Sequence, residues 1–387
     1  MNGTMSHQPT RGDATDRAAA DDDLQQAIRN RIERRWATYF PSLAAAAAPE
    51  VVCRRGTNPH GFSVLLEYEV TFAGARPEHV LAKVRRDSRF GPYHRQDVTR
   101  APELLRLEFD ELSKAYRYFQ ALNDGLRVVR PLDYLEELNT VLIERASGCD
   151  LGLLDRFDDA SLLAAFTRCG RWLRAFHQDI HEAHTRVWTV GEFEAQLMKR
   201  RQKLLSQGVP AARLDPLLRG VVRAAHACRE RTVPCSMLHG DYKLRHVWAS
   251  PGSIQVLDFG NVHTGDCYVD VASFLVELSV LRLGSPWFDS KRVSRYGGAF
   301  LSGYFSTEPP PLLGFYVVEA LLKKWMRRLR SWSRTAAAAR LQACARGVGA
   351  ASLVERFYID RWFEARVRES LDRRVAQDVE SSVEPHD

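Results

Sequence analysis

Two aspartates lie close together in the stretch Met237–Gly260, which reads MLHGDYKLRHVWASPGSIQVLDFG. Asp241 follows His-Gly in an expected loop, and Asp258 ends an apolar run and precedes Phe-Gly. The turn signal SPGS predicts a short hairpin that brings both carboxylates to the same end. Such a pair suits phosphoryl transfer: one carboxylate orients and deprotonates a hydroxyl, and the other holds a magnesium ion that bridges phosphates. The alternative is that each aspartate only caps a turn.

The motif HGDYKLRHV, followed by VLDFG, resembles the catalytic core of the aminoglycoside phosphotransferase and choline kinase family. The segments GRWLRAFHQ and GDCYVDVASFL resemble two further parts of that family, and the resemblance covers residues 51–280. It implies an α+β, protein-kinase-like fold of two lobes. A small N-terminal lobe with an antiparallel sheet would precede a larger, mainly helical C-terminal lobe. The resemblance also implies ATP and Mg²⁺ as cofactors.

The same resemblance assigns roles to the residues that match the family pattern. Asp241 is expected to be the catalytic base, with His239 beside it in the catalytic loop, and Asp258 the main metal ligand. Asp270, in the segment GDCYVDVASFL, is expected to support the loop and not to contact substrate.

In the N-terminal lobe the resemblance places Lys83, in VLAKV, at the α- and β-phosphates. Its expected partner is Glu108, with Glu111 as the alternative three residues along the same helix face. An ordinary surface ion pair is the competing interpretation. The loop RRGTNPHGFS would cover the phosphates with Gly56 and Gly61, although it lacks GxGxxG and suits a plain hairpin turn equally well. The residues expected to hold the adenine through backbone groups are Ile143, Glu144 and Ala146.

One position departs from the family pattern. Asparagine is expected five residues after the base, where it would bind metal and steady the aspartate, but this chain has His246. Neutral imidazole can bind a metal, although it suits softer ions than Mg²⁺. His246 is therefore a candidate second metal ligand, in a site that tolerates Mn²⁺. The alternative is a pseudokinase that binds nucleotide with weak or no transfer.

Hydrophobic periodicity organises the rest of the chain. Residues 21–40 and 101–122 have helical spacing, whereas residues 51–86 and 127–148 read as strands. This pattern predicts disordered residues 1–20, an N-terminal lobe with a leading helix over 21–147, and a C-terminal lobe over 148–375. The C-terminal lobe should be helical apart from the hairpin, and residues 376–387 should be a disordered tail.

Composition narrows the class of protein. The 387 residues are 45% apolar and 27% charged, as in ordinary globular proteins. The N-terminus has no apolar segment typical of a secretory signal, and no window approaches the roughly 18 apolar residues of a membrane-spanning helix. Seven scattered cysteines without a CxxC pair predict reduced thiols in the cytoplasm and no structural zinc. His177, His181 and His184 could share a helix face and bind metal, but His177 matches the family helix, which favours a structural role.

The net charge of +7 indicates an anionic partner. Residues 321–346 contain no acidic residue, and an apolar stripe runs through them at helical spacing. They could form a core-facing helix with a basic outer face, the wall of an anionic pocket, or a peripheral membrane contact through 321–334. Basic character favours a neutral or anionic hydroxyl compound, such as a sugar or glycolipid precursor, over a polycationic aminoglycoside. A small-molecule acceptor is expected because no activation segment follows Asp258, and no nucleic-acid-binding module is present.

Overall fold

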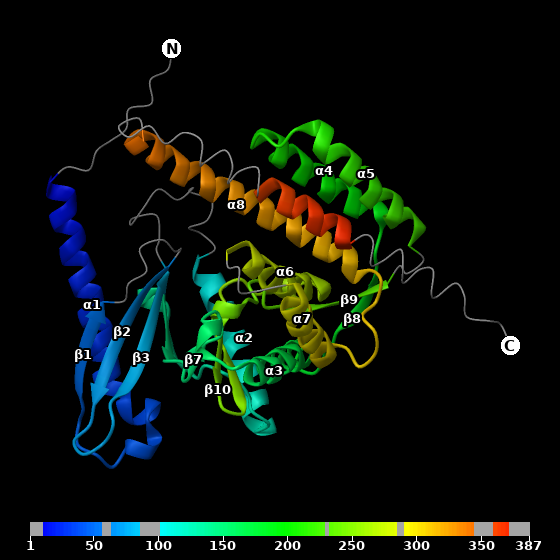
Figure 1. Cartoon of the computed structure of the whole chain (residues 1–387). Coiled ribbons are helices and arrows are strands. Elements are labelled where there is room, and N and C mark those ends of the chain that lie inside the picture. Colours follow the sequence, from blue (N-terminus) through cyan, green and yellow to red (C-terminus); the bar gives the residue numbers. More distant parts are fainter. Residues whose placement is uncertain are drawn as a thin grey trace. The chain divides into compact units, whose positions relative to one another are not determined.

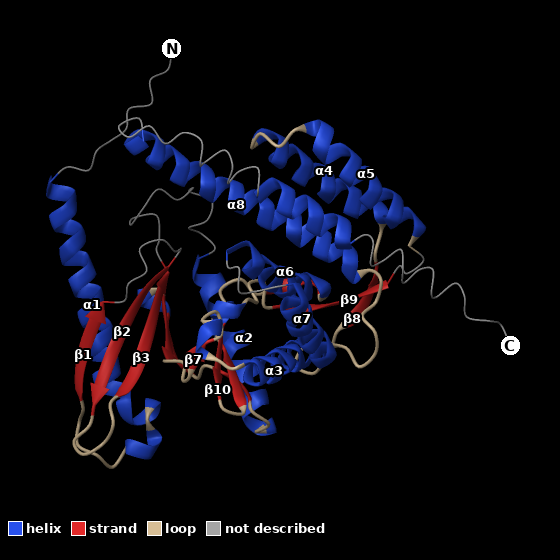
Figure 2. Ribbon diagram, in the orientation of Figure 1, coloured by secondary structure: helices blue, strands red, loops and turns tan. Residues whose placement is uncertain are grey.

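The structure, a computed structural model, describes residues 11–55, 63–85, 101–228, 232–284, 290–343 and 359–370 (Figure 1). The chain forms two compact units. The first consists of Met1–Gly148 and Gln255–Gly260, and the second of Cys149–Ile254 and Asn261–Asp387. The first unit contains an antiparallel sheet and the second is mainly helical, so the predicted α+β fold class is confirmed (Figure 2).

Five strands form the antiparallel sheet of the first unit, in the order β1-β2-β3-β6-β5. Their bounds, in the same order, are Glu50–Arg55, Ser63–Thr71, Glu78–Arg85, Thr140–Glu144 and Pro131–Leu135. Side chains alternate between the two faces of a strand. In β3 the small and branched residues Val80, Ala82 and Val84 are buried on one face. Lys83 therefore projects from the opposite face.

Helix α1 (Arg11–Tyr39) packs on the face that carries Ala82. It is fixed by Asp133 of β5, whose Oδ2 accepts hydrogen bonds from Tyr39 (2.6 Å), Arg31 (3.0 Å) and Arg35 (3.1 Å). The helix begins ten residues earlier than expected, so the prediction of disorder is wrong for residues 11–20. No proline or glycine interrupts residues 13–39, which lets the helix extend toward the N-terminus. The predicted tails at 1–10 and 376–387 lie outside the described residues.

Helix α2 (Ala101–Leu122) coincides with the predicted helix 101–122. Its amphipathic pattern buries Leu105, Leu112, Ala115 and Phe119. Glu108 is also buried, at 4% exposure, so its carboxylate needs a partner inside the unit. After α2 the chain forms the short strand β4 (Leu126–Val128).

The second unit is built mainly from helices. These are α3 (Asp159–Gln178), α4 (Val190–Ser206), α5 (Ala211–Ala227), α6 (Tyr268–Gly284), α7 (Ser290–Tyr304), α8 (Leu313–Ala343) and a helix at residues 359–370. The expectation that only the hairpin interrupts them is wrong, because β12 (His263–Asp266), β9 (Thr232–Leu238) and β8 (His184–Val187) form a three-stranded sheet. None of the helices in the described part of the chain is long and apolar enough to cross a membrane.

Two glycines bring α3 and α7 into close contact. A Cβ added to Gly170 would lie 2.0 Å from the carbonyl oxygen of Phe300, and one added to Gly303 would lie 2.1 Å from that of Thr167. Only hydrogen atoms fit at these positions. The close crossing places Tyr304, at the end of α7, beside His177 near the end of α3.

The predicted hairpin is present between the two aspartates. Its strands are β10 (Val247–Ser250) and β11 (Ser253–Val256), and Gly252 in the turn has a φ of 77°. The chain passes from the second unit to the first within β11 and returns after Gly260. Asp241 consequently belongs to the second unit, and Asp258 belongs to the first.

Candidate functional site

The loop that carries Asp241 is held by a buried carboxylate. Asp270, in the first turn of α6, accepts hydrogen bonds from the backbone N–H groups of His239 (2.7 Å) and Gly240 (3.0 Å). Gly240 has a φ of 76°, and a Cβ there would lie 2.1 Å from the carbonyl oxygen of Asn261. Glycine is therefore required immediately before Asp241. The prediction that Asp270 supports this loop is confirmed.

Asp270 is part of a buried hydrogen-bonded chain. His177 Nε2 lies 3.3 Å from its carboxylate, and His177 Nδ1 lies 2.9 Å from the hydroxyl of Tyr304. Burial raises the pKa of Asp270, but the interactions with His177 and His239 outweigh burial and hold that pKa below its usual value. The carboxylate is thus ionised at neutral pH, and its two oxygens accept from the two backbone N–H groups.

The sequence predicted a structural role for His177, and its buried contacts agree with that role. The alternative of a three-histidine helix face is wrong, because α3 ends at Gln178, before His181 and His184. In the part of the chain that the structure describes, these three histidines do not gather as a set of metal ligands.

The carboxylate of Asp241 faces a lysine that sequence reasoning did not single out. Lys243 Nζ lies 2.6 Å from Asp241 Oδ2, and both side chains are partly exposed. The loop is anchored at this point by Tyr242, which is buried, stacks on Trp172 with ring centroids 5.5 Å apart, and donates to the carbonyl oxygen of Cys169. The sequence signal that could have identified Lys243 is its spacing of two residues from Asp241, because residues two apart lie on the same side of an extended segment.

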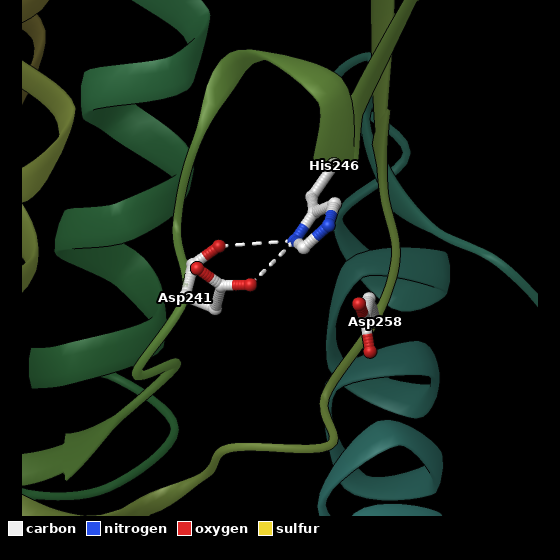
Figure 3. A group of neighbouring side chains, drawn as sticks. All are labelled: Asp241, His246 and Asp258. Carbon is white, nitrogen blue, oxygen red and sulfur yellow. Dashed lines mark hydrogen bonds and ion pairs between the residues drawn. The ribbon is translucent and has the colours of Figure 1, made fainter. Parts of the chain in front are cut away.

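His246 lies against the backbone of Asp241 (Figure 3). Its Nδ1 is 3.0 Å from the carbonyl oxygen of Asp241 and 3.7 Å from Oδ2. A carbonyl oxygen only accepts, so Nδ1 carries the proton in the neutral ring. The lone pair is then on Nε2, which is the atom suited to bind a metal.

In the first unit, Lys83 and Asp258, both partly buried, form a cluster with the buried Glu108. Lys83 Nζ lies 2.5 Å from Glu108 Oε1 and 2.6 Å from Asp258 Oδ1. The predicted pair of Lys83 and Glu108 is therefore present, and Glu108 takes the partner role for which Glu111 was the alternative. Burial lowers the pKa of the Lys83 ammonium, but the two carboxylates outweigh burial and raise that pKa above its usual value.

The backbone beside Asp258 is shaped for this cluster. Asp258 has a φ of 68°, a strained value for a residue with a side chain, and such values gather at functional sites. A Cβ on Gly260 would lie 2.7 Å from Lys83 Nζ and 3.3 Å from Asp258 Oδ1. Glycine two residues after Asp258 therefore leaves room for the lysine to reach the carboxylate.

The residues expected at the adenine lie at the end of β6. Ile143 pairs with Leu81 of β3 and Pro131 of β5. The N–H of Glu144 donates to the carbonyl oxygen of Arg130 (2.9 Å), so that N–H group is already used within the unit. Ala146 follows and is 9% exposed. The expected phosphate-covering residues Gly56 and Gly61 lie outside the described residues.

The basic segment of α8 has a buried apolar side. Its buried residues are Leu321, Leu322, Trp325, Met326 and Leu329. Lys323 contacts Glu319 (3.1 Å), and Lys324 pairs with Glu277. These contacts agree with the interpretation as a core-facing helix with a basic outer face. The side chains of residues 332–334 lie outside the described part.

A comparison with models of known protein families shows which family the chain belongs to. A model described as the phosphotransferase enzyme family matches residues 84–315, which is more than half of the 387 residues. The chain belongs to this family, as the resemblance of the HGD and DFG segments predicted. A comparison with curated protein sequences gives no match.

Several solved structures are similar over most of the chain. A choline/ethanolamine kinase family protein from Mesorhizobium loti is 15% identical, with 91% of this chain and 98% of that chain covered and a TM-score of 0.47. Choline kinase LicA from Streptococcus pneumoniae is 14% identical, with coverages of 89% and 99% and a TM-score of 0.44. A glucosamine kinase in complex with glucosamine, ADP and inorganic phosphate is 14% identical, with coverages of 85% and 84% and a TM-score of 0.49. Likenesses this distant carry no argument about the substrate of this chain.

Proposed function

We propose that this protein is an ATP-dependent phosphotransferase that phosphorylates a hydroxyl group of a small molecule. The observation that carries the proposal is the contact of Lys83 with both Glu108 and Asp258. A partly buried ammonium beside a carboxylate is suited to nucleotide phosphates and to the metal ion that accompanies them. Membership of the phosphotransferase enzyme family supports the same conclusion.

In this proposal each residue has a defined task. Asp241 orients the acceptor hydroxyl and takes its proton, and His239 shapes the loop around it. Lys83 contacts the α- and β-phosphates, held in place by Glu108. The residues that would hold Mg²⁺ or Mn²⁺ are Asp258 and His246. A carboxylate oxygen is a hard ligand that suits either ion, and an imidazole nitrogen favours Mn²⁺. The bound metal would neutralise phosphate charge.

The acceptor is proposed to be a neutral or anionic hydroxyl compound, such as a sugar, a glycolipid precursor or a related metabolite. The net charge of +7 supports this class over polycationic acceptors. The backbone groups of Ile143, Glu144 and Ala146 are proposed to bind the adenine. The N–H of Glu144 is the exception, because it already donates to the carbonyl oxygen of Arg130. The proposed compartment is the cytoplasm, where ATP is available and thiols are reduced. Contact of residues 321–334 with a membrane surface stays a prediction.

A second candidate function is a pseudokinase that binds nucleotide and acts as a scaffold. The observation in its favour is His246, which contacts the backbone carbonyl of Asp241 where the family pattern has asparagine. The two functions differ in turnover. An enzyme releases phosphate slowly from metal-bound ATP even without acceptor, because water replaces the hydroxyl, whereas a pseudokinase only binds.

The proposal is tested by measuring ADP release from Mg-ATP and Mn-ATP with a panel of hydroxyl metabolites. We expect at least one acceptor to stimulate turnover. Asp241→Asn should bind ATP normally but lower kcat by about 10²-fold or more, since the base is lost. The matched control is Asp155→Asn, an exposed aspartate of the same unit, which should keep full activity. Nucleotide binding without turnover under any condition would favour the pseudokinase, and wild-type kcat in Asp241→Asn would remove Asp241 as the base.

A further inference from the structure

A cavity of about 400 Å³ lies among α6, α7, α8 and the helix at residues 359–370, all parts of the second unit. Its walls are mainly apolar, and Leu275, Leu301 and Val317 each leave a partly exposed side chain in it. All of its described lining residues come from Leu275 onward, so none belongs to the loop of Asp241 or to the hairpin. Small-molecule sites have volumes of about 300–1,000 Å³, so this cavity is large enough to be one.

Three glycines leave the space open. Gly297 and Gly298 lie inside α7, and Gly314 lies in the first turn of α8. An added Cβ would meet nothing within 4 Å at Gly298, and its nearest neighbours would be at 3.6 Å for Gly297 and 3.9 Å for Gly314. None of the three has a φ in the left-handed region. Neither close packing nor backbone conformation therefore requires glycine here, although glycine weakens a helix relative to alanine. What the three residues share is open space in the cavity wall.

The connection between α7 and α8 forms a constrained wall. Pro309, Pro310 and Pro311 line the cavity, and each proline ring fixes its own φ. The carbonyl oxygens of Pro310 and Pro311 accept hydrogen bonds from the N–H groups of Leu313 (3.0 Å) and Gly314 (3.2 Å). A site that is already formed loses less free energy to ordering when a ligand binds. The cavity is therefore suited to a small molecule without rearrangement of this connection.

The two charged residues of the described lining neutralise each other. Arg366 and Glu369, three residues apart on the same helix, form an ion pair. The guanidinium of Arg366 also lies over the ring of Trp362, 5.9 Å from its centroid. A ligand with a charged head group would have to compete with this pair, whereas the lining hydroxyls of Ser279 and Ser294 can accept hydrogen bonds from a neutral polar group. The charge balance thus favours an uncharged ligand.

We propose that this cavity binds a neutral, mainly apolar small molecule with one hydrogen-bonding group, such as a medium-chain alcohol. The proposal goes beyond phosphoryl transfer and does not depend on it. An apolar cavity of about 150 Å³ holds one benzene molecule, so about 400 Å³ suits an apolar body of roughly 16 non-hydrogen atoms. A bound molecule would contact α6, α7 and α8 at once. Since α6 and α7 carry Asp270 and Tyr304, binding should stabilise the helices that support the loop of Asp241.

The first measurement is the binding of N-phenyl-1-naphthylamine, a neutral fluorescent probe, to the full chain. We expect saturable binding with a Kd of about 100 µM or lower, as ligands of this size reach. 1-Decanol, decanoate and decylammonium share one chain length and differ in charge, so they are matched competitors of the probe. 1-Decanol should displace the probe at least about 5-fold more effectively than either ion, because each ion would have to separate Arg366 from Glu369.

Two variants fill the cavity from different helices. Gly298→Leu adds a side chain in α7 where a Cβ meets nothing, and Val317→Trp enlarges a partly exposed side chain in α8. Each should weaken probe binding by about 10-fold or more, because the new side chain takes the place of the ligand's apolar contacts. Ser302→Leu is the matched control, since Ser302 is exposed on α7, one turn after Gly298, and lies outside the lining. It should stay within about 2-fold of wild type.

Glu369→Gln tests the charge balance without filling the cavity. Glu369 is 40% exposed, so its replacement leaves the core intact. Loss of the ion pair offers Arg366 to an anionic head group, and the affinity for decanoate relative to 1-decanol should rise by about 5-fold or more.

Each outcome supports or overturns the proposal. In wild type and in Ser302→Leu, saturating 1-decanol should raise the melting temperature, whereas the folded filling variants should show a smaller rise. Wild type that binds no probe saturably overturns the site, and so does probe affinity that is unchanged in both filling variants. Equal displacement by the three competitors, or an unchanged preference in Glu369→Gln, overturns the neutral class of ligand. If neither filling variant folds, Glu369→Gln decides alone.

Discussion

Lys243 Nζ lies 2.6 Å from Asp241, and Lys83 Nζ lies 2.6 Å from Asp258. Each carboxylate is therefore balanced by an ammonium inside its own unit before any nucleotide is bound. In the proposed function, nucleotide phosphates would give Lys83 a further anionic partner, because they carry several negative charges. At the residue scale, binding of ATP is thus expected to release Asp258 from Lys83 so that its carboxylate can bind the metal.

His246→Asn should change the metal preference of the proposed enzyme. An amide oxygen is a harder ligand than imidazole, so the rate with Mg²⁺ relative to that with Mn²⁺ should rise by about 3-fold or more. The measurement is turnover of both proteins with each metal. His263→Asn is the control, since His263 is exposed and its Nδ1 lies 2.7 Å from the carbonyl oxygen of Asn261. An unchanged ratio in His246→Asn would show that His246 is not a metal ligand.

Asp270→Asn should destabilise the protein in a pH-dependent way. The amide can accept only one of the two backbone N–H bonds, so the free energy of unfolding should fall by at least about 2 kcal/mol at pH 7. The pKa of Asp270 is lowered by folding, so its stabilisation is present above the unfolded pKa, about 3.9, and is lost as the pH falls through the folded value. The difference between the two proteins should accordingly shrink below about pH 4.

Urea unfolding between pH 3 and pH 7, at about one-unit intervals, measures this difference. Asp155→Asn, at an exposed position of the same unit, is the control and should differ little from wild type at every pH. A constant difference between Asp270→Asn and wild type over the whole range would contradict the proposed ionised state of Asp270.

At the scale of elements, the loop depends on helices far away in the sequence. Asp270 comes from α6, His177 from α3 and Tyr304 from α7, and they meet in one buried chain of contacts. The approach of α7 to α3 requires Gly170 and Gly303, because their Cβ positions are filled by backbone oxygens. The geometry of the loop therefore depends on the crossing of these two helices.

Gly170→Ala should lower the free energy of unfolding by at least about 2 kcal/mol, because the methyl group meets a backbone oxygen and the helices must move apart. Gly298→Ala is the matched control in α7. A Cβ there meets nothing within 4 Å, so the higher helix propensity of alanine should raise stability by about 0.5–1 kcal/mol. Urea unfolding of both variants measures the effect, and similar values for the two would contradict the close crossing.

At the scale of the whole molecule, the candidate site residues are divided between the two units. Lys83, Glu108 and Asp258 belong to the first, whereas Asp241, Lys243 and His246 belong to the second. The chain crosses between the units after Gly148, within β11 and after Gly260. The two aspartates, 17 residues apart in the sequence, therefore fall in different units.

The sequence alone determined the features that depend on neighbouring residues. The turn SPGS predicted the hairpin, and helical spacing predicted α2 with both of its bounds. The HGD and DFG segments, read with their spacing, indicated the family that the match over residues 84–315 then showed. These signals are local, because backbone periodicity and turn chemistry are set by residues close together in the chain.

Only the tertiary structure decided the contacts between distant residues. The pairing of Tyr304 with His177, the glycine-dependent crossing of α3 and α7, and the three-stranded sheet of β12, β9 and β8 join segments that no local pattern connects. Lys243 is an intermediate case: its spacing from Asp241 was visible, but its orientation required Tyr242 and Leu244 to be buried on either side. Burial is a property of the packed chain, and for that reason the partner of the proposed base emerged only from the structure.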